Sequence, residues 1–285
     1  MRCDLHVHTV HSGMCNIPGL KAFCRESYSE PAAVYEKLKR RGMSLVTITD
    51  HDSIDALEGL RRHPDFFVSE EITCVLPSGT EMHVGVYDIT ERQHLELQRR
   101  RNDLARLIAY LREQRLFFSA NHIFSSLTGQ RSFADFEFFA REFEAFEVLN
   151  GCMLEITNRN AAEFAQRLGR IGLGGSDAHT LATVGRCWTA VPGAKNKAEF
   201  LAALRAGRAT VHGEHGSYWK LTRDIVQIGL CMVQSQPLTA PVALLGWLAP
   251  GITLANYFLE KRFSRIWTER LYALTRNSVV SEVAA

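Results

Sequence analysis

Residues 4–12 read DLHVHTVHS, and this stretch places three histidines within six positions on an expected first β-strand. Residues two apart on a strand point to the same side, so His6 and His8 are expected to converge on one point. An inward-facing imidazole must be hydrogen-bonded or hold a metal, because burying an unpaired polar group is costly. The stretch therefore indicates a strand that ends in hydrogen-bonded or metal-binding histidines.

Beyond this stretch, short apolar runs alternate with segments of helical spacing. Helices are expected near Pro31 and over 91–115 and 158–170, and further strands over 44–49, 65–73, 81–89, 116–122, 143–151 and 171–179. This alternation favours a parallel sheet and predicts an α/β fold, a distorted seven-stranded TIM-like (β/α)7 barrel. An open doubly wound sheet is the alternative, but no glycine-rich phosphate loop follows the first strand.

Most of the metal-binding residue types fall at or just beyond the carboxyl ends of these strands, where the active sites of barrels form. They are His6, His8, His51, Glu71, His83, His122, Asp177 and His179. A lone His83 or His122 is more often a hydrogen-bonded core residue, and Glu71 alone would serve equally as a helix cap. The joint placement of the set at strand ends instead predicts a metal site.

The ordered motifs DLHVHT, TITDHD, the Glu of SEEIT, the His of EMHVGVY, the His of ANH and GGSDAH resemble those of the polymerase and histidinol phosphatase (PHP) superfamily. The resemblance covers roughly residues 3–190 and implies a distorted barrel with a trinuclear metal site. It further implies that one metal is held by His6, His8, Glu71 and Asp177, a second by Glu71, His83 and His122, and a third by His51 and His179.

One position departs from the family pattern. After its HxHT motif the family usually supplies another acidic ligand, whereas this chain reads HSGMCNIP over 11–18. The matching residue is Asn16, a weaker oxygen ligand, with His11 and Cys15 as substitutes. The resemblance therefore implies two or three divalent ions, and an imidazole-rich set suits manganese, iron or zinc better than magnesium or calcium.

Clustered cations suit the hydrolysis of phosphate esters, because they acidify a water and draw charge from the phosphate oxygens. We expect metal-dependent hydrolysis of a phosphomonoester or small phosphodiester by metal-activated hydroxide. The catalytic residues are expected to be His6, His8, Glu71, Asp177 and His179. The alternatives are a metal-dependent amidohydrolase and a catalytically silent domain that senses a metal or a phosphorylated ligand, the latter motivated by Asn16.

Three acidic residues beside the motifs are expected to orient the ligand imidazoles: Asp4, Asp50 and Asp52. Turn capping explains Asp52 equally well. Arg186 is expected to bind a substrate phosphate, with a plain surface arginine as the alternative. Glu147 and Asn150, at the end of another strand, are interpreted as scaffold.

Composition and net charge limit the class of substrate and the cellular compartment that we expect. The 285 residues carry a formal net charge of +2 and no long basic face, which argues against a long nucleic acid. We expect a small phosphorylated substrate, and the oligomeric state stays open. Seven scattered cysteines without a Cys-x-x-Cys pair, and no apolar leader, predict a cytoplasmic protein with reduced thiols.

The chain changes character near its end, so we divide it into a metal-dependent phosphoesterase barrel, 1–219, and an apolar helical tail, 220–285. Residues 225–259 carry no charge and have basic flanks. This pattern predicts contact with the cytoplasmic face of a membrane, through a bent hairpin or re-entrant segment that turns at Pro250-Gly251. The alternative is a helix pair that covers the barrel or forms a dimer interface.

Overall fold

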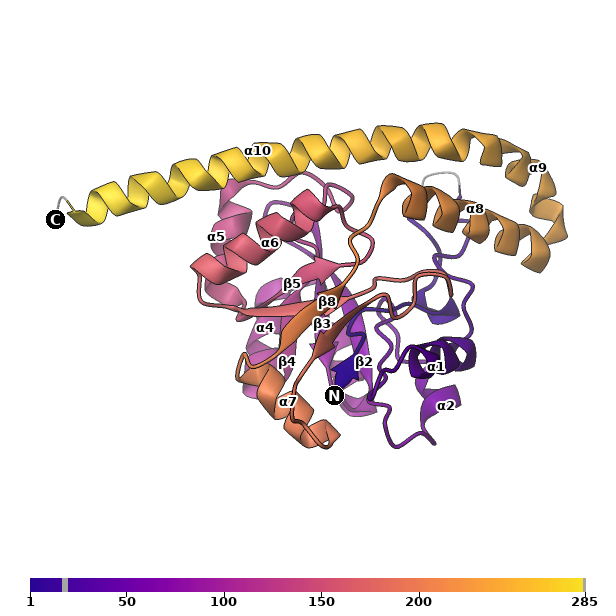
Figure 1. Cartoon of the computed structure of the whole chain (residues 1–285), viewed down its shortest axis with the longest axis horizontal. Helices are drawn as coiled ribbons and strands as arrows, with labels where there is room; N and C mark the ends of the chain where they lie inside the picture. The colour runs from indigo at the N-terminus through magenta and orange to yellow at the C-terminus, as the bar shows by residue number, and fades with distance from the viewer. Residues whose placement is uncertain (17–19, 284–285) are drawn as a thin grey trace.

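The computed structural model describes residues 1–16 and 20–283, which fold around two β-sheets (Figure 1). Residues 17–19, which include the end of HSGMCNIP, and 284–285, the end of the expected tail, lie outside the described residues. The larger sheet has the order β2-β3-β4-β5-β6, and its strands are β2 (Ser69–Val75), β3 (Glu81–Tyr87), β4 (Phe117–Ala120), β5 (Ala145–Asn150) and β6 (Ile171–Gly175). The smaller, antiparallel sheet consists of β1 (Arg2–Cys3), β7 (Cys187–Ala190) and β8 (Thr210–Gly213).

The predicted seven-stranded barrel is wrong. Within the described residues the strands form a five-stranded mixed sheet and a three-stranded antiparallel sheet, and no seven-stranded barrel is present. One reason is the short link between β2 and β3, residues 76–80, where the Leu76 amide donates to the Thr80 carbonyl at 2.8 Å. A parallel crossover needs a dozen or more residues, so β3 pairs antiparallel with β2.

The second reason lies in the two expected strands that carry the first motifs. The Val7 amide donates to Thr49 Oγ1 at 2.9 Å, and the Thr9 amide donates to Asp50 Oδ1 at 2.5 Å. Because side chains take these backbone donors, the two segments lie side by side without forming a ladder. One backbone hydrogen bond joins the segments, from the Thr49 amide to the Val7 carbonyl at 2.9 Å. Their other strand-like contacts are single bridges at Val7–Ala178, Val46–Phe66 and His51–Glu71.

The five-stranded sheet separates an apolar core from a polar face. Along β2 and β3, Ile72 and Val84 belong to the main hydrophobic core, whereas the neighbouring Glu71 and His83 are buried polar residues. Successive side chains of a strand point to opposite faces, so the apolar and polar residues sort to the two sides of the sheet.

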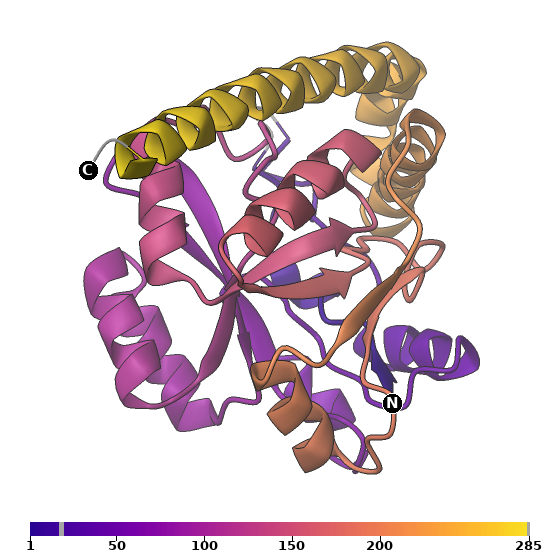
Figure 2. The same ribbon diagram turned by 60° about the vertical axis from the view of Figure 1, so that its left-hand side comes forward.

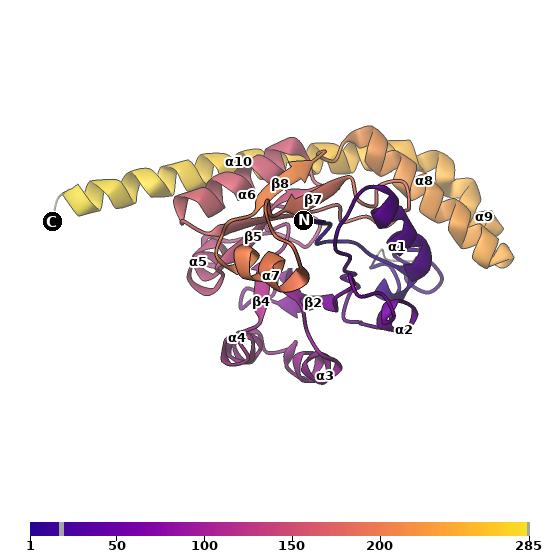
Figure 3. The same cartoon turned by 60° about the horizontal axis from the view of Figure 1, so that its bottom comes forward.

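Helices wrap around the core side of this sheet (Figures 2 and 3). They are α3 (Glu91–Arg100), α4 (Leu104–Glu113), α5 (Phe133–Glu142) and α6 (Glu155–Arg167). The helix expected over 91–115 is broken, because Asp103 caps α4 by accepting from the Arg106 amide at 3.1 Å. Elsewhere, the shorter helices are η1 (Val10–Ser12), α1 (Pro31–Arg40), α2 (Leu57–Leu60) and α7 (Lys197–Arg205).

The C-terminal region consists of helices, namely α8 (Tyr218–Ser235), η2 (Pro237–Thr239), α9 (Ala240–Ala243), η3 (Leu244–Leu248) and α10 (Ala249–Val283). The turn predicted at Pro250-Gly251 is not there, because both residues lie in the first turn of α10. The chain leaves α8 at Gln236 and returns beside it, so that the Tyr218 hydroxyl donates to the Pro250 carbonyl at 3.3 Å.

The long helix α10 is packed on the rest of the chain (Figure 1). Phe263 and Trp267 are buried in the main core, where the Trp267 ring lies 4.4 Å from that of Phe136. Over the part of the chain that the structure describes, no helix has the length and apolar character that crossing a bilayer requires. The division into 1–219 and 220–285 stays a prediction.

Candidate metal centre

Eight of the nine predicted ligands converge at the polar face of the sheet. His6 and His8 lie in the first motif, His51 bridges to Glu71 in β2, and the others follow on β3 or directly after β4 and β6. The converging residues are His6, His8, His51, Glu71, His83, His122, Asp177 and His179. Asn16, the ninth predicted ligand, is exposed.

Glu71 lies at the centre of this cluster. Its Oε2 atom is 3.0 Å from His6 Nε2 and 3.5 Å from His51 Nδ1. Its Oε1 atom is 3.3 Å from His122 Nε2 and 3.6 Å from His83 Nδ1. His8 Nε2 also lies 3.4 Å from Oε2. The two oxygens therefore face different sets of imidazoles, as a carboxylate shared between two cations would.

Asp177 holds the other side of the cluster. Its Oδ1 atom is 3.2 Å from His8 Nε2, 3.4 Å from His6 Nε2 and 3.7 Å from His179 Nδ1. The rings of His8 and His179 stack at 4.4 Å. His6 and His8 thus join the Asp177 side of the cluster to Glu71.

Four groups of three donors have all their ligand atoms within 4.8 Å of one another. The groups are His8-His51-His179, His6-His8-Asp177, His6-Glu71-His122 and His51-Glu71-His83. They share members, so they mark overlapping places for cations. The residues fit such ions, because His51 Nδ1 and His122 Nδ1 are buried without a hydrogen-bond partner and the nitrogen-rich donor set suits manganese, iron or zinc.

The charges of the cluster favour bound cations. Burial alone would raise the pKa of Glu71, but the imidazoles of His6, His83 and His51 lower it well below its usual range. Burial would also raise the pKa of Asp177, but the neighbouring imidazoles outweigh it and lower this pKa well below its usual range. Both carboxylates are therefore ionised at neutral pH.

The imidazoles of the metal-free protein differ in their protonation. Burial lowers the pKa of His8 and of His51, so both are neutral and offer lone pairs. Burial also disfavours the charge of His6, but Glu71, Asp177 and Glu147 outweigh it and raise the pKa of His6 well above its usual value. A cation at this place would take over the positive charge that the proton supplies.

Hydrogen bonds fix the orientation of two ligand rings. His6 Nδ1 lies 2.8 Å from Glu147 Oε1, which directs Nε2 into the cluster. His8 Nδ1 lies 2.9 Å from Ser12 Oγ, and that hydroxyl donates to Asp50 Oδ1 at 2.7 Å. Asp50 therefore orients an imidazole through Ser12, and Glu147, which was interpreted as scaffold, contacts one directly.

The other predicted supporting residues contact different partners. Asp4 is buried and accepts from the amides of Ser176 and Gly185, both at 2.8 Å, so it braces the loop that carries Asp177. Burial raises the pKa of Asp4 to about 6. Asp52 accepts from the Thr73 amide at 3.0 Å and pairs with Arg101.

Arg186 lies outside the cluster of ligands. Its guanidinium donates to both carboxylate oxygens of Glu214 at 3.2 Å, and Lys220 lies 2.7 Å from the same carboxylate. A contact between Arg186 and a substrate phosphate stays a prediction.

Two residues of the cluster have backbone φ angles outside the regions that non-glycine residues usually occupy. His122 has φ 31° and Asp177 has φ 51°, in the left-handed region that non-glycine residues seldom occupy. A Cβ atom at Gly175 would lie 2.4 Å from the backbone nitrogen of His6, so only glycine allows this approach. The strained residues thus directly follow β4 and β6, and the close contact lies where β6 delivers Asp177 beside the first motif.

Sequence reasoning missed Glu26. Its Oε2 atom lies 3.5 Å from His51 Nε2, at the place where the family pattern directed attention to Asn16. The loop folds back so that Met14 bridges Arg25, and the Glu26 amide donates to the Gly13 carbonyl at 3.1 Å. Glu26 is the first acidic residue after Asp4, a signal that was present in the sequence.

Two asparagines were also missed as partners of the acidic ligands. Asn121 donates from Nδ2 to Glu71 Oε1 at 2.8 Å. Asn150 donates from Nδ2 to Asp177 Oδ2 at 3.0 Å and to Glu147 Oε2 at 2.9 Å. Asn150 thus binds the Asp177 oxygen that does not face the imidazoles, whereas Asn121 shares Glu71 Oε1 with His122 and His83.

Comparison with known proteins places part of the chain in a described family. Residues 155–209, which include Asp177 and His179, match the family model described as PHP-associated. Over 54 residues the chain is 39% identical to the uncharacterised protein MJ1587 of Methanocaldococcus jannaschii, a stretch that covers 19% of this chain and 30% of that protein.

Two solved structures share the fold. A two-domain protein from Bacteroides vulgatus, which contains a predicted PHP-like metal-dependent phosphoesterase, aligns with a TM-score of 0.59 at 16% identity, over 75% of this chain and 65% of that one. PsfC from Pseudomonas syringae aligns with a TM-score of 0.55 at 21% identity, over 82% of this chain and 98% of that one.

This chain therefore spans less than two thirds of the B. vulgatus protein and less than a third of MJ1587. The resemblance drawn from the sequence motifs is confirmed for residues 155–209, which match the PHP-associated family model, and the chain shares its fold with the two solved structures.

Proposed function

We propose that this protein hydrolyses a small phosphate ester in a metal-dependent reaction. The observation that carries the proposal is the position of Glu71, whose two oxygens face different sets of imidazoles within overlapping candidate cation groups. The PHP-associated region and the shared fold support it. A cluster of this kind has an evident use at a phosphate, which carries several oxygens that accumulate charge during the reaction.

The chain's residues would hold two or three divalent ions of manganese, iron or zinc. Glu71 and Asp177 provide the ionised oxygens, and neutral His8 and His51 provide nitrogens. When bound, such ions withdraw charge from phosphoryl oxygens and lower the pKa of a water. Glu26 offers a carboxylate beside His51 that Asn16 does not.

The surrounding groups keep this arrangement in place. Glu147 holds His6 at 2.8 Å, and Ser12 with Asp50 holds His8, so both Nε2 atoms point into the cluster before any ion arrives. The side chain of His179, with 21% of its surface exposed, is the most accessible imidazole of the set. We propose that His179 contacts the substrate phosphate.

The test combines metal content with turnover. The full chain is loaded with Mn²⁺, Fe²⁺ or Zn²⁺, its metal content is measured by elemental mass spectrometry, and phosphate release is followed from mononucleotides and sugar phosphates. Glu71→Gln keeps the shape of the side chain and removes its charge, and Glu137→Gln on the exposed side of α5 is the matched control. We expect E71Q to lose both metal and turnover, and E137Q to keep both.

Other outcomes would assign a different function. Full metal content without turnover of any phosphate ester would make the protein a metal-dependent sensor. Hydrolysis of amides or lactones in place of phosphate esters would make it an amidohydrolase. Metal content and turnover that E71Q leaves unchanged would overturn the proposed metal centre.

A further inference from the structure

The C-terminal helices expose an unusual number of large apolar side chains. Trp219 and Trp247 each expose 76% of their surface, and Leu238 exposes 96%. Most of the exposed large hydrophobic residues in the described chain belong to this region, and the others of the group are Ile225, Val226, Leu230, Leu248, Ile252, Leu254, Phe258 and Leu259. We call the exposed side chains of residues 219–265 the tail face.

The charges of the same region are sorted by sign. Its two acidic residues, Asp224 and Glu260, are both buried against the body of the protein. Thr180 donates to Asp224 at 3.0 Å, and the Ser126 amide donates to Glu260 at 2.8 Å. The basic residues lie on the outer side or at its edge: Lys220, Arg223, Lys261, Arg262 and Arg265. The tail face is therefore apolar and positively charged.

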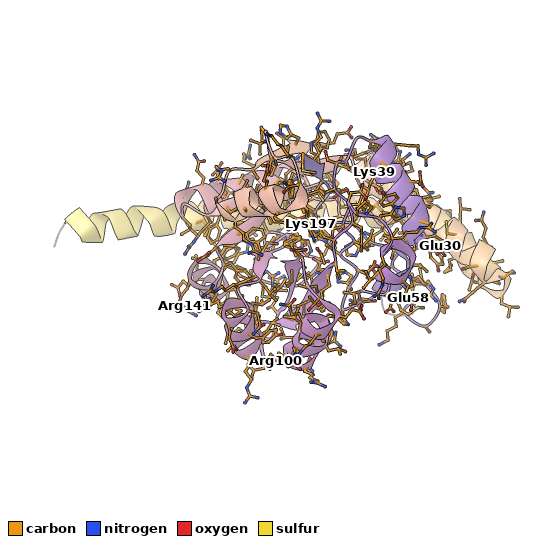
Figure 4. All side chains as sticks on the ribbon, turned by 90° about the horizontal axis from the view of Figure 1, so that it is seen from below. Glu30, Lys39, Glu58, Arg100, Arg141 and Lys197 are labelled. Atoms are coloured by element: carbon orange, nitrogen blue, oxygen red, sulfur yellow. The ribbon has the colours of Figure 1, made fainter. Side chains whose placement is uncertain are left out.

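Other helices show a different surface. In Figure 4 the labelled charged side chains of both signs extend outward from the rest of the molecule, and they are Glu30, Lys39, Glu58, Arg100, Arg141 and Lys197. On α3 and α4, exposed arginines have acidic neighbours, as Arg99 has in Glu96 at 2.6 Å and Arg106 has in Asp103 at 3.1 Å. On the tail face the exposed bases outnumber the acids: its own two acids are buried, and the exposed Glu214, 2.7 Å from Lys220, and Glu269 lie only at its border.

We propose that the tail face docks on the surface of an anionic lipid membrane. Exposed tryptophans and leucines enter the boundary between headgroups and acyl chains, and neighbouring arginines and lysines attract anionic headgroups. Docking in the plane of the membrane needs no spanning helix, and none of the described helices is long and apolar enough to span a bilayer. A second copy of the chain is a poorer occupant, because it would bring two positively charged faces together.

The proposal is tested by flotation of the full chain with two kinds of vesicle. One kind is phosphatidylcholine alone, and the other is phosphatidylcholine and phosphatidylglycerol in equal parts. The protein is expected to float only with the anionic vesicles, and less as the salt concentration rises. This result does not depend on the proposed phosphoesterase activity, since it uses no substrate.

Two pairs of variants assign the binding to the tail face. Leu259→Asp on α10 is compared with Leu95→Asp on α3, because each leucine exposes 58% of its surface. Arg262→Glu/Arg265→Glu is compared with Arg99→Glu/Arg106→Glu, which also reverses two exposed charges. Both changes on α10 are expected to weaken partitioning by about tenfold or more, and both controls to leave it within about twofold.

Several results would overturn the proposal. They are equal binding to both kinds of vesicle, no binding to either, or losses that the controls share. A dimer in sedimentation equilibrium that L259D dissociates, without vesicle binding, would assign the tail face to a second copy. Binding to soluble polyglutamate with no preference for vesicles would assign it to an acidic protein. Circular dichroism and metal content of each variant show that the fold is intact.

Discussion

The protonation of single histidines connects the metal centre to pH. His6 lies within 3.4 Å of carboxylate oxygens of Glu71, Glu147 and Asp177. In the metal-free protein these charges overcome burial and raise the pKa of His6 well above the ordinary 6.5. Burial likewise opposes the charge of His122, but a hydrogen bond with Glu71 raises its pKa. Protons and cations therefore compete for the same nitrogens.

We expect the affinity for Mn²⁺ to keep rising as the pH increases beyond 6.5, because binding must displace the protons of His6 and His122. Those protons stabilise the metal-free fold below the pKa of an unfolded histidine, and this contribution is lost as the pH rises through the raised native pKa. Calorimetric titration with Mn²⁺ over a pH series, in two buffers of different ionisation enthalpy, measures both the affinity and the protons released.

Glu147→Gln provides the comparison for this pH dependence. It removes one of the charges that raise the pKa of His6, so the rise in Mn²⁺ affinity should level off at lower pH. An affinity that does not change between pH 6 and pH 8 would contradict the expected competition.

At the scale of elements, the segments that bear the first two motifs are joined by side chains. Thr49 Oγ1 accepts from the Val7 amide at 2.9 Å and lies 3.2 Å from the Val7 carbonyl oxygen. Both residues are buried. The hydroxyl therefore performs the task that a neighbouring strand's backbone performs in a regular sheet.

We expect Thr49→Val to lower the free energy of unfolding by about 1–3 kcal/mol, because it leaves the buried Val7 amide without an acceptor. The change keeps the volume and the β-branched shape of the side chain. Urea denaturation of the metal-free protein measures the change in the free energy of unfolding. Thr210→Val, at the exposed start of β8, is the control. Equal stability of the two variants would show that the Val7 amide finds another partner.

The elements also show what the sequence can and cannot predict. The short apolar runs predicted strands over 65–73 and 81–89, which overlap β2 and β3. Their direction was predicted wrongly because the turn at 76–80 was not compared with the length that a crossover needs. The motif residues themselves were found, since strand ends and the spacing of two are local features.

Contacts between distant segments were harder to predict. Glu147 reaches His6 from a strand 141 residues further along the chain, and nothing local distinguishes it from a scaffold residue. Glu26 approaches His51 only because its loop folds back on itself. Asn16 occupied the motif position, but the fold leaves it exposed. Contacts between residues that are far apart in the sequence depend on the topology of the whole fold.

At the scale of the whole molecule, α10 completes the main core. Trp267 is 2% exposed and contacts Phe136 of α5, and Phe263 is buried beside it. Glu260 adds a polar contact through Ser126, in the loop that follows His122. The helix that carries part of the tail face is therefore also bound to the body of the protein.

We expect Trp267→Ala to lower the free energy of unfolding by about 3–5 kcal/mol, as removal of a large buried aromatic side chain usually does. Trp247→Ala is the matched control, since that side chain is 76% exposed, and it should change stability by less than about 0.5 kcal/mol. Urea denaturation followed by circular dichroism compares them. Similar midpoints for the two variants would mean that α10 does not belong to the cooperative unit.

The burial of Trp267 has a consequence for the synthesis of the protein. Its core cluster also contains Ile72 of β2 and Phe136 of α5, which leave the ribosome long before α10 does. Until the last helix emerges, these earlier residues form an incomplete core with exposed aromatic surface. The core can therefore close only after α10 has left the ribosome, and nascent chains that still lack this helix are the species that depend on chaperones.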